Sequence, residues 1–405
     1  MAEVLTLPGG FRFGGTSCGL KRSGAPDLSL IVADAAVSAA AMFTSNRVQA
    51  APVVVSREHI AQSRGRVRAV VVNSGNANCC TGKAGLAASR NTALALASRL
   101  GCRSEQVFVC STGVIGVPLA VEKILAGLPA LLPDLGSGPE AFARLARGIL
   151  TTDTRPKMAS ERARVAGHMV RIAGCAKGAG MIAPQLHART ATMLAFVLTD
   201  AAISPALLRR ALAGVAGPTF NSITVDGDTS TNDTVVILAS GASGARIGSA
   251  RGADFAAFVR ALERVCRSLA MQIVADGEGA RHLIEIEVRG APDSQASARV
   301  ARTIADSPLV KTALAGADPN WGRILAAAGR AGVAFDPEKA AIVLAGVPVF
   351  RRGRPLPFDE KTAHERMSAP RYAMRVDLKA GPGRARMWTC ELSEGYVRIN
   401  ADYRT

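Results

Sequence analysis

The residues best suited to chemistry lie within residues 176–200, AKGAGMIAPQLHARTATMLAFVLTD. A glycine-rich turn carries Lys177, and Thr192 stands directly before the apolar run at 193–198. Because an apolar run bounded by turn residues is typical of a buried strand, Thr192 is expected at the start of a core strand. A cut before Thr192 would give it a hydroxyl nucleophile and a free α-amine as base. Many threonines at strand starts only favour the strand, so the local pattern leaves both interpretations open.

A second polar cluster is the turn DGDTSTND at residues 226–233. Its carboxylates are of the type that binds calcium, but the turn lacks the distal glutamate of an EF-hand loop. Hydrogen bonds from these side chains to the backbone, as in Asx and Ser/Thr turns, explain the composition better. The eight cysteines form no C-x-x-C pair and the five histidines are scattered. We therefore predict no metal site, and we expect reduced thiols.

The chain is strongly basic, with 49 Lys and Arg residues, 32 Asp and Glu residues and a formal net charge of +17. Basic residues are spread along the chain, and aromatic residues make up only 4% of it. This composition does not predict the aromatic platform on which nucleic-acid bases stack. Acidic small molecules account for the charge at least as well. The alternative is a nucleic-acid-binding protein with salt-dependent binding and no need for Thr192.

The N-terminus, MAEVLTLPGGF, has no basic region followed by a long apolar core, and no window is apolar for the length of a membrane span. We therefore expect a cytoplasmic protein with no membrane or nucleic-acid partner. At 405 residues the chain is long enough for one large or two ordinary domains. No internal repeat or flexible linker divides it.

The elements that must position these residues are strands interspersed with helices. An apolar strand at 68–72 leads through the turn at 73–78 to a helix over 82–100. Further expected elements are a strand at 107–110, a hairpin around Gly167, a helix over 253–274 and a last strand at 396–400.

Longer motifs in the chain resemble one family. AKGAGMIAP, ATMLAF and TDA are similar to the processing segment of the ornithine acetyltransferase (glutamate N-acetyltransferase) family. The resemblance covers essentially the whole chain through NSGNANCCTG (73–82), CSTGVIG (110–116), TTDT (151–154), FNSITVDGDTSTNDT (220–234), DGEGA (276–280), ADPNWGR (317–323) and INADYRT (399–405).

The resemblance implies a four-layered α/β sandwich similar to N-terminal-nucleophile folds. It also implies self-cleavage between Ala191 and Thr192. The products would be an α chain of residues 1–191 and a β chain of residues 192–405, intertwined halves of one enzyme rather than independent domains. An α2β2 heterotetramer is the implied assembly.

The implied activity is acetyl transfer from N-acetylornithine to glutamate in arginine biosynthesis, by way of an acetyl ester on Thr192. Thr112 and Gly113 would stabilise the oxyanion, and Thr152 is an alternative to Thr151 as a substrate contact. No cofactor is implied, and the use of acetyl-CoA as a further acetyl donor stays open. The amino-acid substrates would contact Thr151, Lys177, Thr192, Glu278, Asn400 and Thr405.

The segment before the scissile bond departs from the family pattern. Residues 185–190 (QLHART) separate MIAP from Ala191, a longer spacing than the family usually has. Thr190 is therefore a second candidate nucleophile. We prefer Thr192 because it adjoins MLAF and follows Ala191, whereas Thr190 follows Arg189. A related family of aminopeptidases uses a nucleophile of the same origin, so a hydrolase is the rival enzyme.

Overall fold

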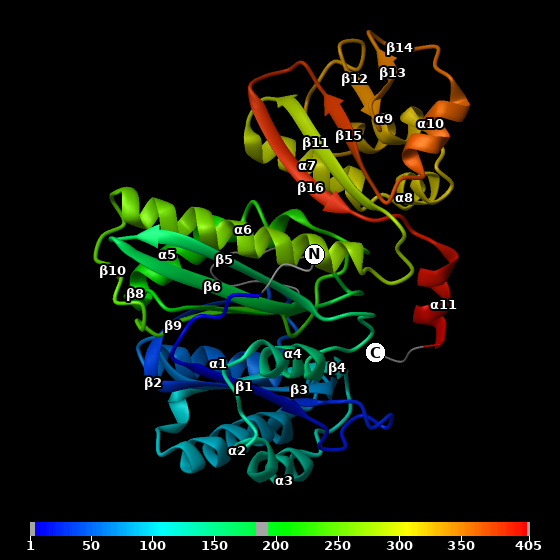
Figure 1. Cartoon of the computed structure of the whole chain (residues 1–405). Coiled ribbons are helices and arrows are strands. Elements are labelled where there is room, and N and C mark those ends of the chain that lie inside the picture. The colour runs from blue at the N-terminus through cyan, green and yellow to red at the C-terminus, as the bar shows by residue number, and fades with distance from the viewer. Residues whose placement is uncertain (1–4, 184–192, 403–405) are drawn as a thin grey trace.

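The computed structural model describes residues 5–183 and 193–402 (Figure 1). Its main body is built on an eight-stranded sheet of order β4-β3-β2-β9-β7-β6-β5, with β1 paired to β2. The β3–β4 and β7–β9 pairs are parallel and the other pairs are antiparallel. The strands are β1 Phe11–Thr16, β2 Leu28–Phe43, β3 Arg66–Asn76, β4 Val107–Val114, β5 Lys157–Val165, β6 His168–Lys177, β7 Leu194–Thr199 and β9 Thr234–Ala239.

The 16-residue strand β2 divides this sheet into two halves. Residues 28–32 pair with β3, whereas residues 38–43 pair with β9. The register against β3 shifts between Val32 and Val37, and an irregularity of this kind bends a strand. One core cluster contains Phe13 and Phe108 from the first half together with Phe196 from the second. The two halves therefore face each other across a shared core.

The outer face of each half carries helices, because successive strand residues point to opposite faces. In β7, Phe196 belongs to the inner core and Val197 to the core under α5 and α6. In β2, Ile31 faces inward and Leu30 packs toward α2 and α3. Helices, half-sheet, half-sheet and helices give the predicted four-layered α/β sandwich (Figure 1). These helices are α2 Gly82–Leu100, α3 Val121–Leu131, α5 Pro205–Ala216 and α6 Ala253–Ala275, with α1 Ala51–Gln62 beside α2. Helix α4 Pro139–Gly148 instead packs against β1, and its Phe142 belongs to the inner core.

Residues 283–389 form a second unit, the C-terminal body, with its own core. Its six-stranded sheet has the order β14-β13-β12-β15-β11-β16. The strands are β11 Leu283–Ala291, β12 Ala341–Leu344, β13 Val347–Arg351, β14 Arg354–Pro355, β15 Arg371–Asp377 and β16 Gly383–Thr389. The helices are α7 Ser294–Ala305, α8 Pro308–Ala315, α9 Trp321–Gly329 and α10 Glu360–Met367.

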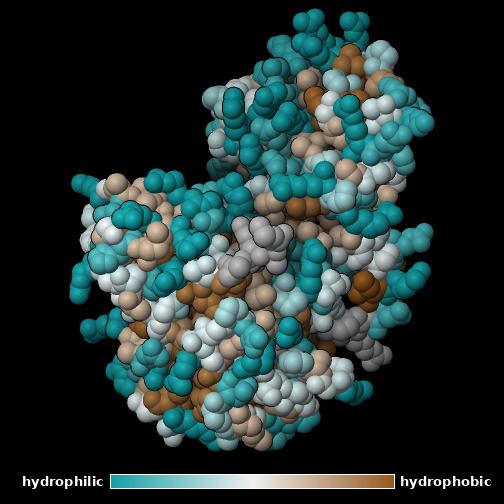
Figure 2. Space-filling view, in the orientation of Figure 1, coloured by the Kyte–Doolittle hydropathy of each residue, from teal (hydrophilic) through white to brown (hydrophobic). Residues whose placement is uncertain are grey.

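After β16 the chain leaves the C-terminal body, and α11 (Glu394–Asp402) runs back beside the main body (Figure 1). The remaining short elements of the main body are the paired strands β8 Ala202–Ile203 and β10 Arg246–Ile247 and the 3-10 turns η1 Ser104–Gln106 and η2 Phe220–Ser222. On the face in Figure 2, hydrophobic side chains occur as patches, mainly on the main body. Among the described helices, none combines the length and apolarity that crossing a membrane requires.

Several predicted elements are confirmed: the helix at 82–100, the long helix now bounded at Ala253–Ala275, and the β5–β6 hairpin that turns at Ala166 and Gly167. The prediction of a last strand at 396–400 was wrong, since these residues lie in α11. An alternating pattern specifies a strand only where one face is buried. Here Val397 and Ile399 are 60% and 37% exposed, and the segment adds no strand to any of the three sheets of the described residues.

The main sheet mixes strands from both sides of residues 184–192. β7 and β9, which follow that segment, lie between β6 and β2, which precede it. The predicted cut between Ala191 and Thr192 and the second candidate Thr190 lie outside the described residues. The division into chains 1–191 and 192–405 therefore stays a prediction.

Candidate active site

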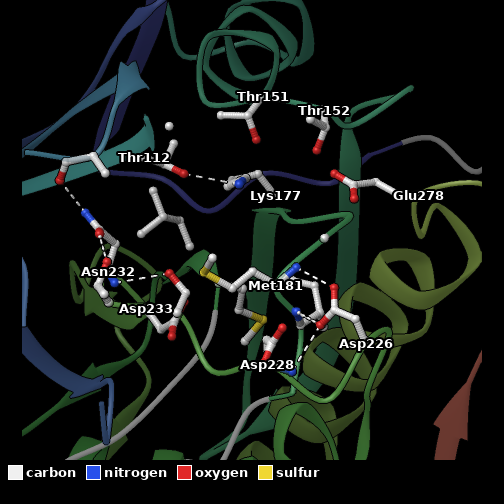
Figure 3. Close-up of a pocket in the computed structure, with 18 of the residues that line it drawn as sticks. Thr112, Thr151, Thr152, Lys177, Met181, Asp226, Asp228, Asn232, Asp233 and Glu278 are labelled. Atoms are coloured by element: carbon white, nitrogen blue, oxygen red, sulfur yellow. Dashed lines mark hydrogen bonds between the residues drawn. The ribbon is translucent and has the colours of Figure 1, made fainter. Parts of the chain in front are cut away.

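A cavity of about 230 Å³ opens where the ends of β4 and β6 approach the turn after α6 (Figure 3). Met193 and Leu194, at the start of β7, also line it. Thr192, Ala191 and Thr405 lie outside the described residues. The structure brings the other predicted site residues together around this cavity: Thr112, Gly113, Thr151, Lys177, Glu278 and Asn400, with Thr152 beside Thr151.

Thr112 and Gly113 are near the end of β4, where it pairs in parallel with β3. Gly113 has a φ of +131°, and a Cβ at this position would lie 2.4 Å from the backbone carbon of Gly75. Two strand ends can approach this closely only if the residue has no side chain. Glycine thus keeps the backbone of residue 113 at the cavity wall, next to the Thr112 hydroxyl.

Lys177 is the last residue of β6, and its side chain is buried. Its ammonium donates a hydrogen bond of 3.1 Å to Thr112 Oγ1 (Figure 3). Burial lowers the pKa of Lys177, the carboxylate of Asp153 raises it, and the nearby Lys157 lowers it further. The pKa of Lys177 therefore lies below the ordinary lysine value, with Asp153 limiting the shift.

A buried cluster of charged residues lies behind Lys177. Lys157 Nζ is 2.5 Å from Asp153 Oδ1 and 2.5 Å from Asp276 Oδ2, and all three side chains are almost fully buried. Asp153 Oδ1 also accepts a 2.6 Å hydrogen bond from Gly178 N, and Asp276 accepts from the Thr154 hydroxyl. Burial alone would raise the pKa of Asp153, but Lys177, Lys157 and the Gly178 N–H lower it to about 2. The cluster joins the TTDT segment, the end of β6 and the end of α6.

Glu278 contributes a buried carboxylate from the turn after α6. Its Oε2 accepts a 2.7 Å hydrogen bond from Asn400 Nδ2, so α11 reaches the cavity. Its backbone N–H donates to Ala179 O at 2.9 Å. A Cβ on Gly180 would lie 2.3–2.6 Å from the carboxyl group of Glu278. The glycine in AKGAGM therefore leaves space for this carboxylate.

The cavity residues that were not predicted as site residues include Asp226, Asn232 and Tyr396. Asp226 accepts hydrogen bonds from Met181 N (2.6 Å) and Ile182 N (2.9 Å) and a 3.3 Å one from Tyr396 Oη. Burial raises the pKa of Asp226. Asn232 Nδ2 donates to Ala77 O at 2.6 Å and Ser111 O at 2.8 Å.

The turn at 226–233 shows why these residues were missed. Asp228 N donates to Asp226 Oδ1 at 3.2 Å, which is a local contact of the predicted kind. The same carboxylate also fixes the backbone of the MIAP segment, far away in sequence. The length of the FNSITVDGDTSTNDT motif was the available signal that this turn does more. Within the described residues, no group of three or more His, Cys, Asp or Glu side chains is arranged to hold a metal ion.

The layered α/β fold and this buried polar cavity define an enzyme of mixed α/β architecture with a site for a small charged molecule. Residues 12–405 match the model of the ArgJ family. The chain belongs to the ArgJ family, which confirms the resemblance to ornithine acetyltransferases.

Individual relatives agree. The arginine biosynthesis bifunctional protein ArgJ of Thermosynechococcus vestitus is 46% identical over 416 residues, covering 99% of this chain and 98% of the relative. The protein of the same name in Thermus thermophilus is 48% identical over 402 residues, covering 99% of this chain and 100% of the relative. Among solved structures, the arginine biosynthesis bifunctional protein of Bacillus halodurans is 44% identical with a TM-score of 0.51. The match covers 52% of this chain and 100% of the Bacillus halodurans chain.

Proposed function

We propose that this enzyme transfers the acetyl group of N-acetylornithine to glutamate, giving ornithine and N-acetylglutamate in arginine biosynthesis. The names of its relatives, at 46% and 48% identity over nearly the whole chain, support this role. The cavity supports it chemically, because Lys177 and Glu278 offer a cation and an anion to a zwitterionic amino acid. The observation that carries the proposal is the meeting of this charged pair with Thr112 and Gly113 beside the start of β7.

The nucleophile in this proposal is Thr192, freed by cleavage after Ala191. Its α-amine, with an ordinary pKa of roughly 7.7–8.0, takes the hydroxyl proton as the oxygen attacks the acetyl carbonyl. The Thr112 hydroxyl and the Gly113 N–H stabilise the oxyanion. The C–N bond then breaks, ornithine leaves with the proton, and an acetyl ester stays on Thr192. The amine of glutamate attacks this ester, which completes a ping-pong cycle.

We assign the further substrate contacts from the family resemblance. Thr151, or its neighbour Thr152, together with Asn400 and Thr405 would complete the binding of the amino-acid substrates. Thr151 and Thr152 both line the cavity, and Asn400 already holds Glu278. These residues come from segments distant in sequence, which suits a site that must recognise both ends of a small molecule.

Processing into residues 1–191 and 192–405 is part of the proposal. The mixing of strands from both segments in one sheet fits two chains that stay associated. The solved Bacillus halodurans chain matches over 100% of its length yet covers 52% of this chain, which is the length expected of one processing product. An α2β2 heterotetramer in the cytoplasm is the assembly we infer from the family resemblance.

Transfer and hydrolysis give different products, and we expect transfer. Purified enzyme with N-acetylornithine and glutamate should form N-acetylglutamate and ornithine in equal amounts. Without glutamate, acetate should form much more slowly, because water must then replace the amine. The products can be quantified by chromatography. Equal rates of acetate release with and without glutamate would favour the aminopeptidase-like hydrolase.

Gly180→Ala is expected to weaken substrate binding. The new Cβ would come within 2.3–2.6 Å of the Glu278 carboxyl group, so that flexible side chain must move. Loss of one charged hydrogen bond corresponds to a rise of at least about 10-fold in KM. Steady-state kinetics with N-acetylornithine measures it. Gly214→Ala is the control, since a Cβ there meets nothing within 4 Å, and an equal effect of both changes would refute this reason for Gly180.

A further inference from the structure

The contact between Lys177 and Thr112 has a direction. A lysine ammonium has three N–H donors and no acceptor, so in the 3.1 Å contact Nζ donates and Thr112 Oγ1 accepts. A threonine hydroxyl has a single hydrogen. With Lys177 directed at an oxygen lone pair, that hydrogen must point elsewhere, and Thr112 is one of the residues that line the cavity (Figure 3).

We propose that Lys177 is a positioning residue of the oxyanion hole, which fixes the Thr112 hydroxyl as a donor aimed at the reacting carbonyl oxygen. The inference rests on the proposed acetyl transfer and adds a role to the substrate contact already assigned to Lys177. Without the ammonium, the hydroxyl could rotate and donate to another acceptor. A cation bound to the oxygen also polarises the O–H bond, because hydrogen bonds in a chain strengthen one another at low dielectric.

The surroundings of Lys177 suit this role. Among the described residues, no carboxylate lies within ion-pair distance of its ammonium, and Thr112 is its hydrogen-bond partner. Carboxylates that act on it from further away are Asp153, Asp233 and Glu278, while Lys157 opposes them. These carboxylates therefore favour the charged form of Lys177 without forming an ion pair with it. The hydrogen bond of its ammonium goes to Thr112.

The backbone next to Lys177 is fixed as well. Asp153 accepts from Gly178 N at 2.6 Å, and Lys157 holds Asp153 at 2.5 Å. Lys157 in turn is held by Asp276 at 2.5 Å. Because these groups are buried, the end of β6 cannot shift without breaking charged hydrogen bonds. The backbone position of Lys177 is therefore fixed by the fold before substrate binds.

A double-mutant cycle tests the proposal. If one residue acts only through another, replacing it lowers kcat no further once the other residue has been replaced. Thr112→Val is expected to lower kcat by about 10²-fold, the usual cost of one oxyanion donor. Lys177→Met should lower kcat by a comparable factor in the Thr112 enzyme but by less than about 3-fold in the T112V enzyme. A rise in KM from a lost substrate contact would appear in both backgrounds.

Thr112→Ser is the matched control, because it keeps the hydroxyl. In the T112S enzyme, Lys177→Met should again lower kcat by most of its original factor. Rates are counted per free N-terminal threonine, measured by mass spectrometry, so incomplete cleavage does not bias them. For a variant that is cut too slowly for this assay, the cleavage rate of freshly translated chain provides the same cycle, since that reaction also passes through a tetrahedral oxyanion.

If the kcat losses of the two single substitutions multiply in the K177M/T112V enzyme, the positioning role is overturned and the proposed function stays intact. A wild-type enzyme that forms no N-acetylglutamate in the same assay would instead refute the proposed function. Loss of kcat confined to backgrounds with a hydroxyl at position 112 is the result that supports Lys177 as a positioning residue.

Discussion

Thr192→Ala is expected to abolish acetyl transfer and to leave the chain uncut after Ala191. The substitution removes the hydroxyl that accepts the acetyl group, and the same hydroxyl is the group that attacks the preceding peptide bond during self-cleavage. Removing the nucleophile of an acyl-transfer enzyme costs roughly 10⁴-fold or more in kcat. N-acetylglutamate formation measures the activity, and a denaturing gel shows whether one or two chains are present.

Two further variants make this result specific. Thr192→Ser keeps a hydroxyl and should retain cleavage and part of the activity. Thr190→Ala should retain both, because Thr190 follows Arg189 and does not adjoin the MLAF strand start. If Thr190→Ala abolished cleavage while Thr192→Ala did not, the longer segment at 185–190 would have moved the nucleophile, and the assignment to Thr192 would be wrong.

Lys157→Met is expected to lower the free energy of unfolding by roughly 3–5 kcal/mol. The lysine is completely buried and lies between Asp153 and Asp276. Methionine has a similar length but no charge, so Asp153 would lose its direct cationic partner and Asp276 would keep only a 3.9 Å contact with the exposed Arg155. Such an uncompensated buried charge is among the most destabilising changes in a folded protein. Urea denaturation of the variant and the parent measures the difference.

The matched control is Lys339→Met in the C-terminal body. Lys339 pairs with Asp336 at 3.4 Å, and their side chains are 68% and 47% exposed. An exposed pair contributes about 0–1 kcal/mol, so this change should scarcely move the denaturation midpoint. Equal losses from the two substitutions would show that burial of the Asp153–Lys157–Asp276 cluster does not matter as argued.

The sequence predicted well those features that depend on local pattern. The helix at 82–100 and the hairpin at Gly167 follow from periodicity and turn residues, and both formed as expected. The family resemblance supplied the four-layered fold and a site-residue set whose described members line one cavity. Their catalytic and binding roles stay predictions until the variants above are measured.

Features that depend on distant partners could not be read from the sequence. Lys157 stands in the polar segment KMASERARV, and nothing local shows that Asp276 meets it from another element. The strand expected at 396–400 became α11, since its alternating pattern finds no sheet edge to join. The same helix carries Asn400 to Glu278, a contact that requires the chain to return from the C-terminal body.

The most direct test of the central claim is mass spectrometry of the purified protein before and after mixing with N-acetylornithine. We expect two chains separated after Ala191, with the chain that begins at Thr192 gaining one acetyl group, which glutamate then removes. An intact, unacetylated chain that still forms N-acetylglutamate at full rate would contradict the account.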